Sequence, residues 1–420
     1  MGVIDSQNVN EIIRRTLSII NPKIITHGEI VGYMVYKMLE SEGRYGEQEL
    51  LDYAMLGMLH DIGLYREDGL HNVADFETAG SPWAHSIYGF LFLKYLSPMG
   101  DKAEIVLYHH LDYSRYGMVK SRYSHITECL ALADKMDNFM RCSETKIKDD
   151  YFSKYRNTQF SGEALDLFHK AEKKYGITAK LASGAYRDEL NDIMSRGVFS
   201  EEYKRGFLEM LVYSIDFRSE HTVVHTMSTV NFAMQLGRLM GLGAKELQSL
   251  YYGALLHDLG KVAIPLDILE SPGRLEEKDM RVMRAHVRIT EMILSGLVDE
   301  EVLEIAARHH EKLDGTGYHK GLTEKDLTLP QQIAAVADML SALYGKRSYK
   351  DSFDSGKIRK ILQEDADNHK ISKQTVDCLM EHYDEVIEKY EEQKDETIGL
   401  YLSIKHQQEE ISKRLKRIVP

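Results

Sequence analysis

The run Leu255-Leu256-His257-Asp258-Leu259-Gly260-Lys261 places an imidazole beside a carboxylate at the end of an apolar helical segment. The spacing of Leu247, Leu250 and Tyr251 before it predicts the helix, and Gly260 is expected to end it in a left-handed turn. At that position an imidazole and a carboxylate can bind one divalent ion, and the second carboxylate oxygen can reach another. Standing alone, such a pair would more often be a capping aspartate beside a surface histidine than a metal site.

The same pattern occurs a second time, as Leu59-His60-Asp61-Ile62-Gly63, at an offset of 257 − 60 = 197 residues. Four further pairs recur in the same order. Their offsets are 198 for His27 and His225, 201 for His85 and His286, 200 for His109 and His309, and 204 for Asp134 and Asp338. Five elements in one order with such similar offsets indicate an internal duplication.

Composition limits the classes of partner. The 420 residues are enough for two domains, and 43% hydrophobic with 28% charged residues is typical of a globular protein. A net charge of −13 argues against a nucleic-acid polymer or an anionic membrane surface as partner. A small anionic substrate is allowed if bound cations reverse the local charge. Three cysteines without paired spacing, no signal peptide and no apolar run of membrane-spanning length predict a cytoplasmic protein.

Amphipathic segments dominate the chain, and strand-like alternation is hard to find, so the predicted fold class is all-α. We expect two tandem helical bundles, over residues 1–180 and 205–385, joined by a linker over 181–204. Residues 386–420 predict a long charged helix with apolar residues at three- and four-residue spacing. This helix either forms a coiled coil across a homodimer or packs back on its own domain.

Each half offers seven candidate ligands on separate helices, the number that a two-metal site needs. The C-terminal set is His225, His257, Asp258, His286, His309, His310 and Asp338. The N-terminal set, a second candidate metal site, is His27, His60, Asp61, His85, His109, His110 and Asp134. In the C-terminal half we assign Asp258 as the bridge. One ion would then take His225, His257 and Asp338, and the other His286, His309 and His310. Imidazole and carboxylate ligands favour iron or manganese, with zinc, nickel or cobalt as alternatives.

Residues 205–385 resemble an HD-GYP domain, a branch of the HD phosphohydrolase superfamily. The resemblance lies in His225, the run Leu256 to Lys261, His286, Ala337-Asp338 and the run His309-His310-Glu311-Lys312-Leu313-Asp314-Gly315-Thr316-Gly317-Tyr318. It implies a phosphodiesterase that linearises a cyclic dinucleotide, chiefly cyclic di-GMP, at a bi- or trinuclear iron or manganese site. The tandem arrangement is also similar to bacterial phosphodiesterases of 3′,3′-cyclic GMP-AMP, so both substrates stay open.

The chemistry agrees with this resemblance, because hydrolysis of a phosphodiester needs its charge neutralised and a hydroxide supplied at neutral pH. Two ions that share a bridging hydroxide would do both. The expected catalytic residues are Asp258 and Lys261, the latter stabilising charge in the transition state. Alternatively Lys261 is a solvated lysine that the helix dipole favours. The expected substrate contacts are Lys261, Asp314, Gly317, Tyr318, Arg347, Lys350 and His221.

Two departures from the family pattern stand out. His319 replaces the proline that follows Gly-Tyr, which removes a rigid turn. His221 stands where members with three metals have glutamate, which favours a dinuclear site. The N-terminal half has Leu64 in place of Lys261 and lacks the Glu311 to Tyr318 run, so we expect a regulatory, structural or weakly active domain there.

Two rival functions remain. The chain could be a catalytically weak receptor that binds metal and cyclic dinucleotide and signals through its C-terminal helix. It could also be an HD phosphohydrolase that acts on another nucleotide, although the Gly315 to Tyr318 run counts against this.

Overall fold

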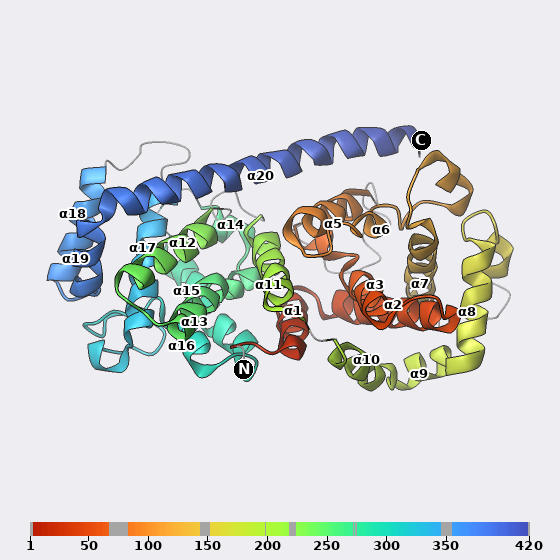
Figure 1. Cartoon of the computed structure of the whole chain (residues 1–420), viewed down its shortest axis with the longest axis horizontal. Helices are drawn as coiled ribbons and strands as arrows, with labels where there is room; N and C mark the ends of the chain where they lie inside the picture. Colours follow the sequence, from red (N-terminus) through yellow and green to blue (C-terminus); the bar gives the residue numbers. More distant parts are fainter. Residues whose placement is uncertain are drawn as a thin grey trace. The chain divides into compact units, whose positions relative to one another are not determined.

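In the part of the chain that the structure, a computed structural model, describes, the regular secondary structure is helical (Figure 1). The described residues are 3–66, 83–142, 152–197, 199–217, 224–271, 273, 275–345 and 355–418. Within these ranges no β-strand occurs, and pairing is limited to two isolated bridges. The prediction of an all-α protein is confirmed.

Two compact units make up the chain. The unit with the HD-GYP-like half comprises residues 1–20 and 211–403, and we call it the C-terminal unit. The other, the N-terminal unit, comprises residues 21–210 and 404–420. This division departs from the sequence-based one at both ends of the chain, because residues 1–20 group with the C-terminal unit and the last helix is shared out between the two.

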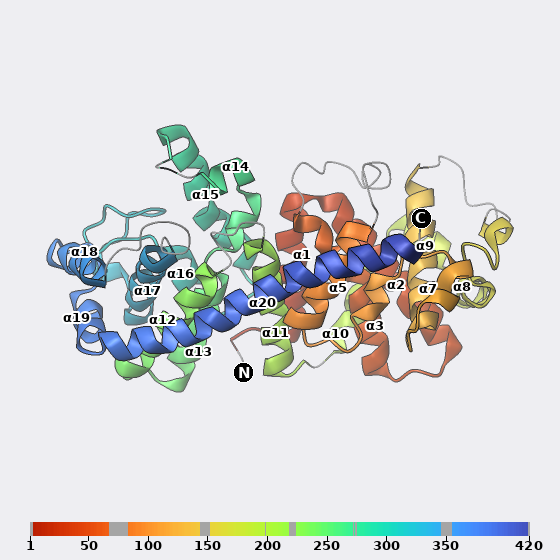
Figure 2. The same cartoon turned by 90° about the horizontal axis from the view of Figure 1, so that it is seen from above.

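The C-terminal unit is a bundle in which α12 and α17 lie side by side in both views (Figure 1, Figure 2). Helix α13 packs against α12 and α16, and α15 packs against η4 and α16. The helices of this unit are α1 (Ser6–Ile20), α12 (His225–Leu239), α13 (Ala244–Leu256), η4 (Leu259–Ala263), α14 (Leu266–Leu269), α15 (Glu277–Leu294), α16 (Glu300–Arg308), η5 (Glu324–Asp326), α17 (Leu329–Gly345), α18 (Ser355–Asp367) and α19 (Lys373–Glu381).

The N-terminal unit repeats this plan, with α2, α3, η1, α5, α6 and α7 in the places of α12, α13, η4, α15, α16 and α17. Helix α2 packs against α3 and α7, and α5 packs against η1 and α6. The helices are α2 (Pro22–Glu42), α3 (Glu47–Leu59), η1 (Ile62–Arg66), α5 (Trp83–Leu96), α6 (Glu104–Leu107), η2 (Tyr113–Met118), α7 (Ser124–Cys142), η3 (Phe152–Tyr155), α8 (Gly162–Tyr175), α9 (Ile177–Ser183) and α10 (Tyr186–Ser195). Helix α11 (Glu201–Asp216) follows and runs into the C-terminal unit.

Helix α1 packs on η4 and α15 of the C-terminal unit. Its buried face consists of Val9, Ile12, Ile13, Thr16 and Leu17. The Asn8 amide donates to the Leu297 carbonyl at 2.9 Å, and the Arg15 guanidinium donates to the Ser295 carbonyl at 2.8 Å. The backbone before the helix is held too, since the Asp299 amide donates to the Val3 carbonyl at 3.0 Å. The predicted 1–180 domain therefore loses its first helix to the other unit.

The segment predicted as a linker, residues 181–204, contains α10, which packs on α2. Glu189 on α10 accepts a hydrogen bond from the Tyr33 hydroxyl at 2.7 Å and pairs with Lys37 at 2.9 Å. Lys37 is buried and Glu189 is partly exposed, so this ion pair is partly shielded from water. The buried residues of α10, Tyr186, Leu190, Ile193 and Met194, follow helical spacing, so the apolar pattern of this segment indicates a helix where we expected a linker.

Helix α20 (Tyr383–Ile418) is the long charged helix that the composition predicts. In the C-terminal unit Tyr390 is buried with its ring 4.6 Å from that of Phe232. In the N-terminal unit Leu415 is fully buried, and the Arg414 guanidinium donates to the Tyr108 hydroxyl at 2.8 Å. The apolar seam is therefore used within the chain, which is the second of the two alternatives that the sequence left open.

The two halves repeat one another in detail at their His-Asp pairs. Helices α3 and α13 both begin at a glycine whose amide donates to a glutamate three residues on, Glu49 at 3.1 Å and Glu246 at 2.8 Å. Gly63 and Gly260 both press against a histidine-bearing helix, since a Cβ on Gly260 would lie 1.9 Å from the His286 carbonyl oxygen. The expected left-handed turn at Gly260 is wrong, because this residue has a negative φ inside η4. Glycine is required at position 260 because the backbone of His286 lies so close to it, and not because the chain reverses its direction there.

None of the described helices combines the length and apolar character needed to cross a membrane. Cys129 and Cys378 are free thiols.

Candidate metal centre

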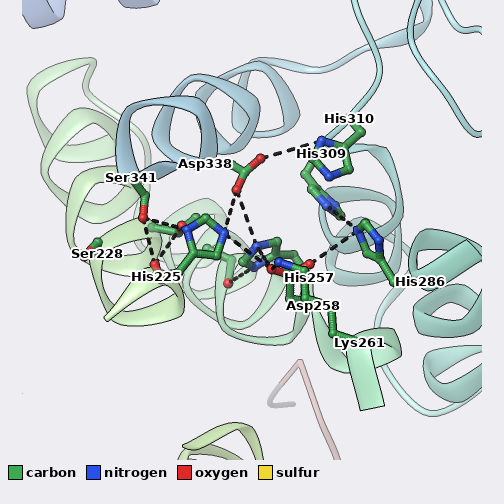
Figure 3. Close-up of polar contacts among 12 residues, drawn as sticks. His225, Ser228, His257, Asp258, Lys261, His286, His309, His310, Asp338 and Ser341 are labelled. Carbon is green, nitrogen blue, oxygen red and sulfur yellow. Dashed lines mark hydrogen bonds and ion pairs between the residues drawn. The ribbon is translucent and has the colours of Figure 1, made fainter. Parts of the chain in front are cut away.

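The C-terminal unit brings all seven of its predicted ligands together from five helices (Figure 3). His225 opens α12, and Asp338 lies on α17 beside it. The other five lie on α15 or directly after α13 and α16; they are His257, Asp258, His286, His309 and His310. Residues at helix ends are suited to a shared metal site, because no further turn of their own helix separates their side chains from the centre.

Asp258 faces both groups of imidazoles. Its Oδ2 lies 3.0 Å from Nε2 of His257 and 3.4 Å from Nε2 of His225, while its Oδ1 lies 3.3 Å from Nε2 of His286. Two clusters with mutual donor distances under 4.8 Å result, one of His225, His257 and Asp258 and one of His286, His309 and His310. A carboxylate with one oxygen toward each cluster has the placement that a bridging ligand requires.

The backbone fixes the imidazoles in the form that metal ions need. The Nδ1 atoms of His257, His286 and His309 lie 2.7, 2.6 and 2.7 Å from the carbonyl oxygen three residues earlier. A carbonyl oxygen only accepts, so each Nδ1 carries a proton and each Nε2 is turned toward the centre, where it can bind a metal ion when it is unprotonated. At the ends of α13 and α16 these carbonyls lack a helical partner, so the histidine also satisfies the helix terminus.

Two buried polar atoms indicate where an ion would bind. His257 Nε2 and Asp258 Oδ1 lack a hydrogen bond of acceptable geometry to any described residue. Such groups are rare in folded proteins and call for an ion or a water. Burial lowers the pKa of His310 to about 3, so that ring is neutral and ready to bind. The donor set therefore fits a pair of divalent ions.

The other cluster is charged. Burial lowers the pKa of His257, but the adjacent Asp258 outweighs it and raises that pKa to about 10. Burial likewise opposes the charge on Asp258, yet His257 and Lys261 hold its pKa well below the usual range. An incoming ion would therefore displace a proton from this cluster.

Lys261 is the cation of the site and is partly buried. Lys261 lies on η4, one turn after Asp258, and its ammonium pairs with the Asp258 carboxylate. Burial lowers its pKa, but the negative charge of Asp258 more than compensates, so the pKa is raised and the cation persists. The alternative of a solvated lysine does not fit, since its side chain is 16% exposed.

The loop after His310 is held rigidly without the proline that His319 replaces. The buried Glu311 carboxylate accepts from the amides of Lys320, at 2.5 Å, and Leu322, at 3.0 Å. His319 Nε2 and the Lys320 ammonium both lie against Glu291 on α15, at 2.9 and 2.6 Å. These contacts fix the turn that the sequence left uncertain.

Replacing Gly317 with alanine should displace Tyr318 from the centre. A Cβ at this position would lie 2.4 Å from the Lys312 amide nitrogen, and backbone cannot yield cheaply. We expect a loss of about 1–3 kcal/mol in stability and a KM raised about tenfold by loss of the ring contact, measured by thermal unfolding and steady-state kinetics. Gly399→Ala is the control, because nothing lies within 4 Å of its Cβ. Unchanged kinetics for Gly317→Ala would contradict the expectation.

The remaining predicted substrate contacts fare differently. Tyr318 stacks on His310 with ring centroids 4.8 Å apart, at the edge of the second cluster. Asp314 is exposed, and its carboxylate accepts a hydrogen bond from the Thr316 amide at 2.9 Å. Asp314 therefore stabilises the conformation of the loop. His221, Arg347 and Lys350 lie outside the described residues.

Three residues near the centre escaped the sequence analysis. Arg284 lies over the Tyr318 ring at 5.0 Å, two residues before the ligand His286. Ser341 contacts His225 Nδ1 at 2.9 Å, and its position one turn after Asp338 was the available signal. Asp216 ends α11 fully buried near Lys261, and burial raises its pKa to about 7. No spacing rule points to Asp216, because it belongs to no motif.

The N-terminal unit assembles its seven predicted residues in the same manner. Asp61 Oδ1 lies 3.4 Å from His85 Nε2, and its Oδ2 lies 3.8 Å from His27 Nε2. The donor clusters are His27, His60 and Asp134; His60, Asp61 and His109; and His85, His109 and His110. In place of the lysine this unit has Leu64, 3% exposed.

Comparisons with known proteins match both halves to one kind of domain. Two family models described as HD domain match, one over residues 24–139 and one over residues 209–373. A 3′3′-cGAMP-specific phosphodiesterase 1 of Vibrio cholerae is 24% identical over 88% of this chain and 89% of its own length. A 3′3′-cGAMP-specific phosphodiesterase 2 of the same organism is 37% identical over 55% of this chain and 48% of its own length.

A cyclic di-GMP phosphodiesterase response regulator of Xanthomonas campestris is 37% identical over 36% of this chain and 41% of its own length. The aligned part thus spans under half of the length of the last two relatives. Among solved structures, a cyclic GMP-AMP-specific phosphodiesterase of V. cholerae superposes with a TM-score of 0.55 over 91% of this chain and 98% of its own, at 16% identity. That likeness extends to the fold of the whole chain.

Proposed function

We propose, starting from the fact that both halves of this chain are HD domains, that it is a metal-dependent phosphodiesterase that opens a cyclic dinucleotide. The observation that carries the proposal is the convergence of seven donors on one buried point beside a partly buried cation. His257 Nε2 and Asp258 Oδ1 face that point without a hydrogen-bond partner in the described part of the chain. Hydrolysis of one phosphodiester bond would yield the linear dinucleotide.

The C-terminal residues divide the work. Two divalent ions would be held by His225, His257, Asp258, His286, His309, His310 and Asp338. Iron and manganese are the preferred candidates for these ions. Bound there, divalent ions neutralise phosphate charge and lower the pKa of water. Lys261 adds a fixed cation that needs no reorganisation as charge develops. Tyr318 offers an aromatic face for a base, within reach of the centre through His310.

The N-terminal half contributes no comparable catalyst in this proposal. Leu64 puts an apolar side chain where the charge-stabilising ammonium would be, and no described segment supplies a counterpart of the loop after His310. The relative that aligns over both halves is named for 3′3′-cGAMP, while the cyclic di-GMP enzyme aligns over about a third of the chain. We therefore put 3′,3′-cyclic GMP-AMP first and cyclic di-GMP second as substrate.

Replacing Arg284 with alanine should raise KM about tenfold with little change in kcat. The guanidinium over Tyr318 can bind a phosphate or hold the ring that stacks on a base, and both act on substrate binding. Steady-state kinetics at two salt concentrations measure the effect, which salt should diminish. Arg288→Ala is the matched control, an exposed arginine one turn further along α15. Equal KM values for the two variants would remove Arg284 from the substrate site.

The proposed function is tested with protein reconstituted anaerobically with Fe(II) or Mn(II). Both cyclic dinucleotides and a panel of mononucleotides are offered, and the products are separated by chromatography. Linear dinucleotide from either cyclic substrate supports the proposal. Binding of a cyclic dinucleotide without turnover in any metal form would leave a receptor, and turnover of mononucleotides alone would leave a different HD phosphohydrolase.

Two lesser expectations accompany the proposal. Free Cys129 and Cys378 fit the reducing cytoplasm. A homodimer through α20 would have to use residues that the chain itself leaves open, such as Leu402, which is 56% exposed. Sedimentation of the wild type and Leu402→Glu compares the two states, and equal monomer masses would exclude the dimer.

A further inference from the structure

The two centres differ in the partner of their first imidazole. His225 Nδ1 lies 2.9 Å from the Ser341 hydroxyl oxygen, which in turn donates its proton to the His225 carbonyl at 2.9 Å. In the N-terminal unit His27 Nδ1 lies 2.7 Å from Oδ2 of Asp137. Ser341 and Asp137 hold the same register, three residues after Asp338 and Asp134 on α17 and α7. A neutral hydroxyl in one half is thus a carboxylate in the other.

This exchange changes the donor strength of the imidazole. A carboxylate on Nδ1–H fixes the tautomer and makes the opposite nitrogen more basic, so the ring binds a cation more strongly. Asp137 is 2% exposed, which keeps water from weakening the contact. On the inner side, His27 Nε2 lies 3.1 Å from Oδ1 of Asp134. The Ser341 oxygen carries no charge and gives His225 no such reinforcement.

Charge differs between the centres in the same sense. The N-terminal centre has three carboxylates close to its imidazoles, those of Asp61, Asp134 and Asp137, and Lys135 at 3.9 Å from Asp134 is partly exposed. The C-terminal centre has two carboxylates close to its imidazoles, those of Asp258 and Asp338. The partly buried Lys261, whose N-terminal counterpart is Leu64, pairs with Asp258, and Asp216 lies near Lys261. The N-terminal centre therefore has one more carboxylate against its imidazoles and lacks the cation that would assist hydrolysis.

The N-terminal centre also contains buried polar atoms that make no hydrogen bond within the described ranges. Nε2 of His60 and Nε2 of His109 are buried without a hydrogen bond to any residue in the described ranges, and so is Oδ2 of Asp134. His60 and His109 are 0% and 1% exposed. Their Nδ1 atoms lie 2.8 and 2.6 Å from the carbonyl oxygens of Gly57 and Val106, which turns both Nε2 lone pairs inward.

We propose that the N-terminal half holds a second centre for a first-row divalent ion, which binds its metal more tightly than the C-terminal centre and does not hydrolyse substrate. Asp137 is the positioning residue that sets this affinity through His27. The inference rests on the proposed function in one respect, namely that the C-terminal centre binds the same kind of ion. The tight ion would stabilise the N-terminal unit, because it binds the folded state alone.

The test measures metal binding to the full chain, independently of turnover. Metal-free protein is titrated with Mn(II) or Zn(II) against a competing chelator, and bound metal is counted by mass spectrometry after gel filtration. We expect two classes of site. Asp61→Ala should remove the tight class and Asp258→Ala the weak one. Asp137→Ser, which copies the C-terminal arrangement, should weaken the tight class by about 10- to 100-fold and leave the weak class unchanged.

Asp137→Asn guards against a simple folding defect, because the amide oxygen keeps the hydrogen bond and loses only the charge. We expect an affinity between those of the wild type and Asp137→Ser, with an unchanged circular dichroism spectrum. Equal affinities for the wild type, Asp137→Ser and Asp137→Asn would overturn the role of Asp137. An unchanged metal count in Asp61→Ala would overturn the second centre itself.

The two proposals fail separately. A chain that turns over a cyclic dinucleotide but keeps its full metal count in Asp61→Ala contradicts only the second centre. A chain that shows the tight class of site but hydrolyses neither cyclic dinucleotide contradicts only the phosphodiesterase.

Discussion

Replacing Asp258 with alanine should lower turnover of the cyclic dinucleotide by at least about 10³-fold, whereas Asp61→Ala should retain most of the activity. Asp258 is the only described residue of the C-terminal unit whose carboxylate oxygens lie within 3.5 Å of His225, His257 and His286. Without it the two imidazole clusters lose their common ligand. Asp61 has the same placement in the half with leucine in place of the site's lysine. Product formation by chromatography and bound metal measured on the same samples would separate lost chemistry from lost ions.

The comparison also locates the reaction within the chain. Loss of activity in Asp258→Ala alone places hydrolysis in the C-terminal half. Equal losses in both variants would show that the halves work together, and loss in Asp61→Ala alone would contradict the assignment.

The second large effect is expected at Lys261. Lys261→Met should lower kcat by about 10²- to 10³-fold while the protein keeps its metal and nearly its KM. The physical reason is that a partly buried ammonium, whose pKa Asp258 raises against the effect of burial, stabilises negative charge that grows only in the transition state. Methionine preserves the length and most of the packing of the side chain. Single-turnover rates and metal counts on the same preparation measure the two quantities.

Lys278→Met, an exposed lysine at the start of α15, serves as the matched control. Lys261→Arg should recover part of the rate because it restores the charge, although the planar guanidinium sits differently. If Lys261→Met instead lost its metal and kept its rate per bound ion, Lys261 would be a structural partner of Asp258 and not a catalytic group.

The sequence was sufficient for the fold class and for the gathering of the ligands. Helical periodicity and the five offsets can both be read directly from the sequence. The structure brings both sets of seven residues together from the predicted helices. The order in the loop after His310 could not be predicted from the loss of proline at His319, since Glu311 and Glu291 hold the loop through contacts 9 to 29 residues apart.

What the sequence missed depends on contacts between distant segments. The apolar face of α1 predicts burial but not the surface that it covers, so its placement on η4 and α15 could not be foreseen. Helix α10 is attached by polar bonds of Glu189 and by an apolar face that includes Leu190 and Ile193; the short apolar pattern was a signal that the linker prediction overlooked. Asp137 and Ser341 could have been found by comparing the two halves residue by residue one turn beyond the aspartate ligands.

The placement of α1 has a consequence for synthesis of the protein. On the ribosome residues 6–20 emerge about 240 residues before the start of their binding surface on η4 and α15. At typical rates of elongation this helix waits for roughly 10 to 60 s with Val9, Ile12 and Leu17 uncovered. During that interval the N-terminal HD domain can fold as a complete insertion behind it, apart from its share of α20. A nascent chain stalled before residue 259 should therefore bind a holdase chaperone through its first helix, and release should follow completion of α15.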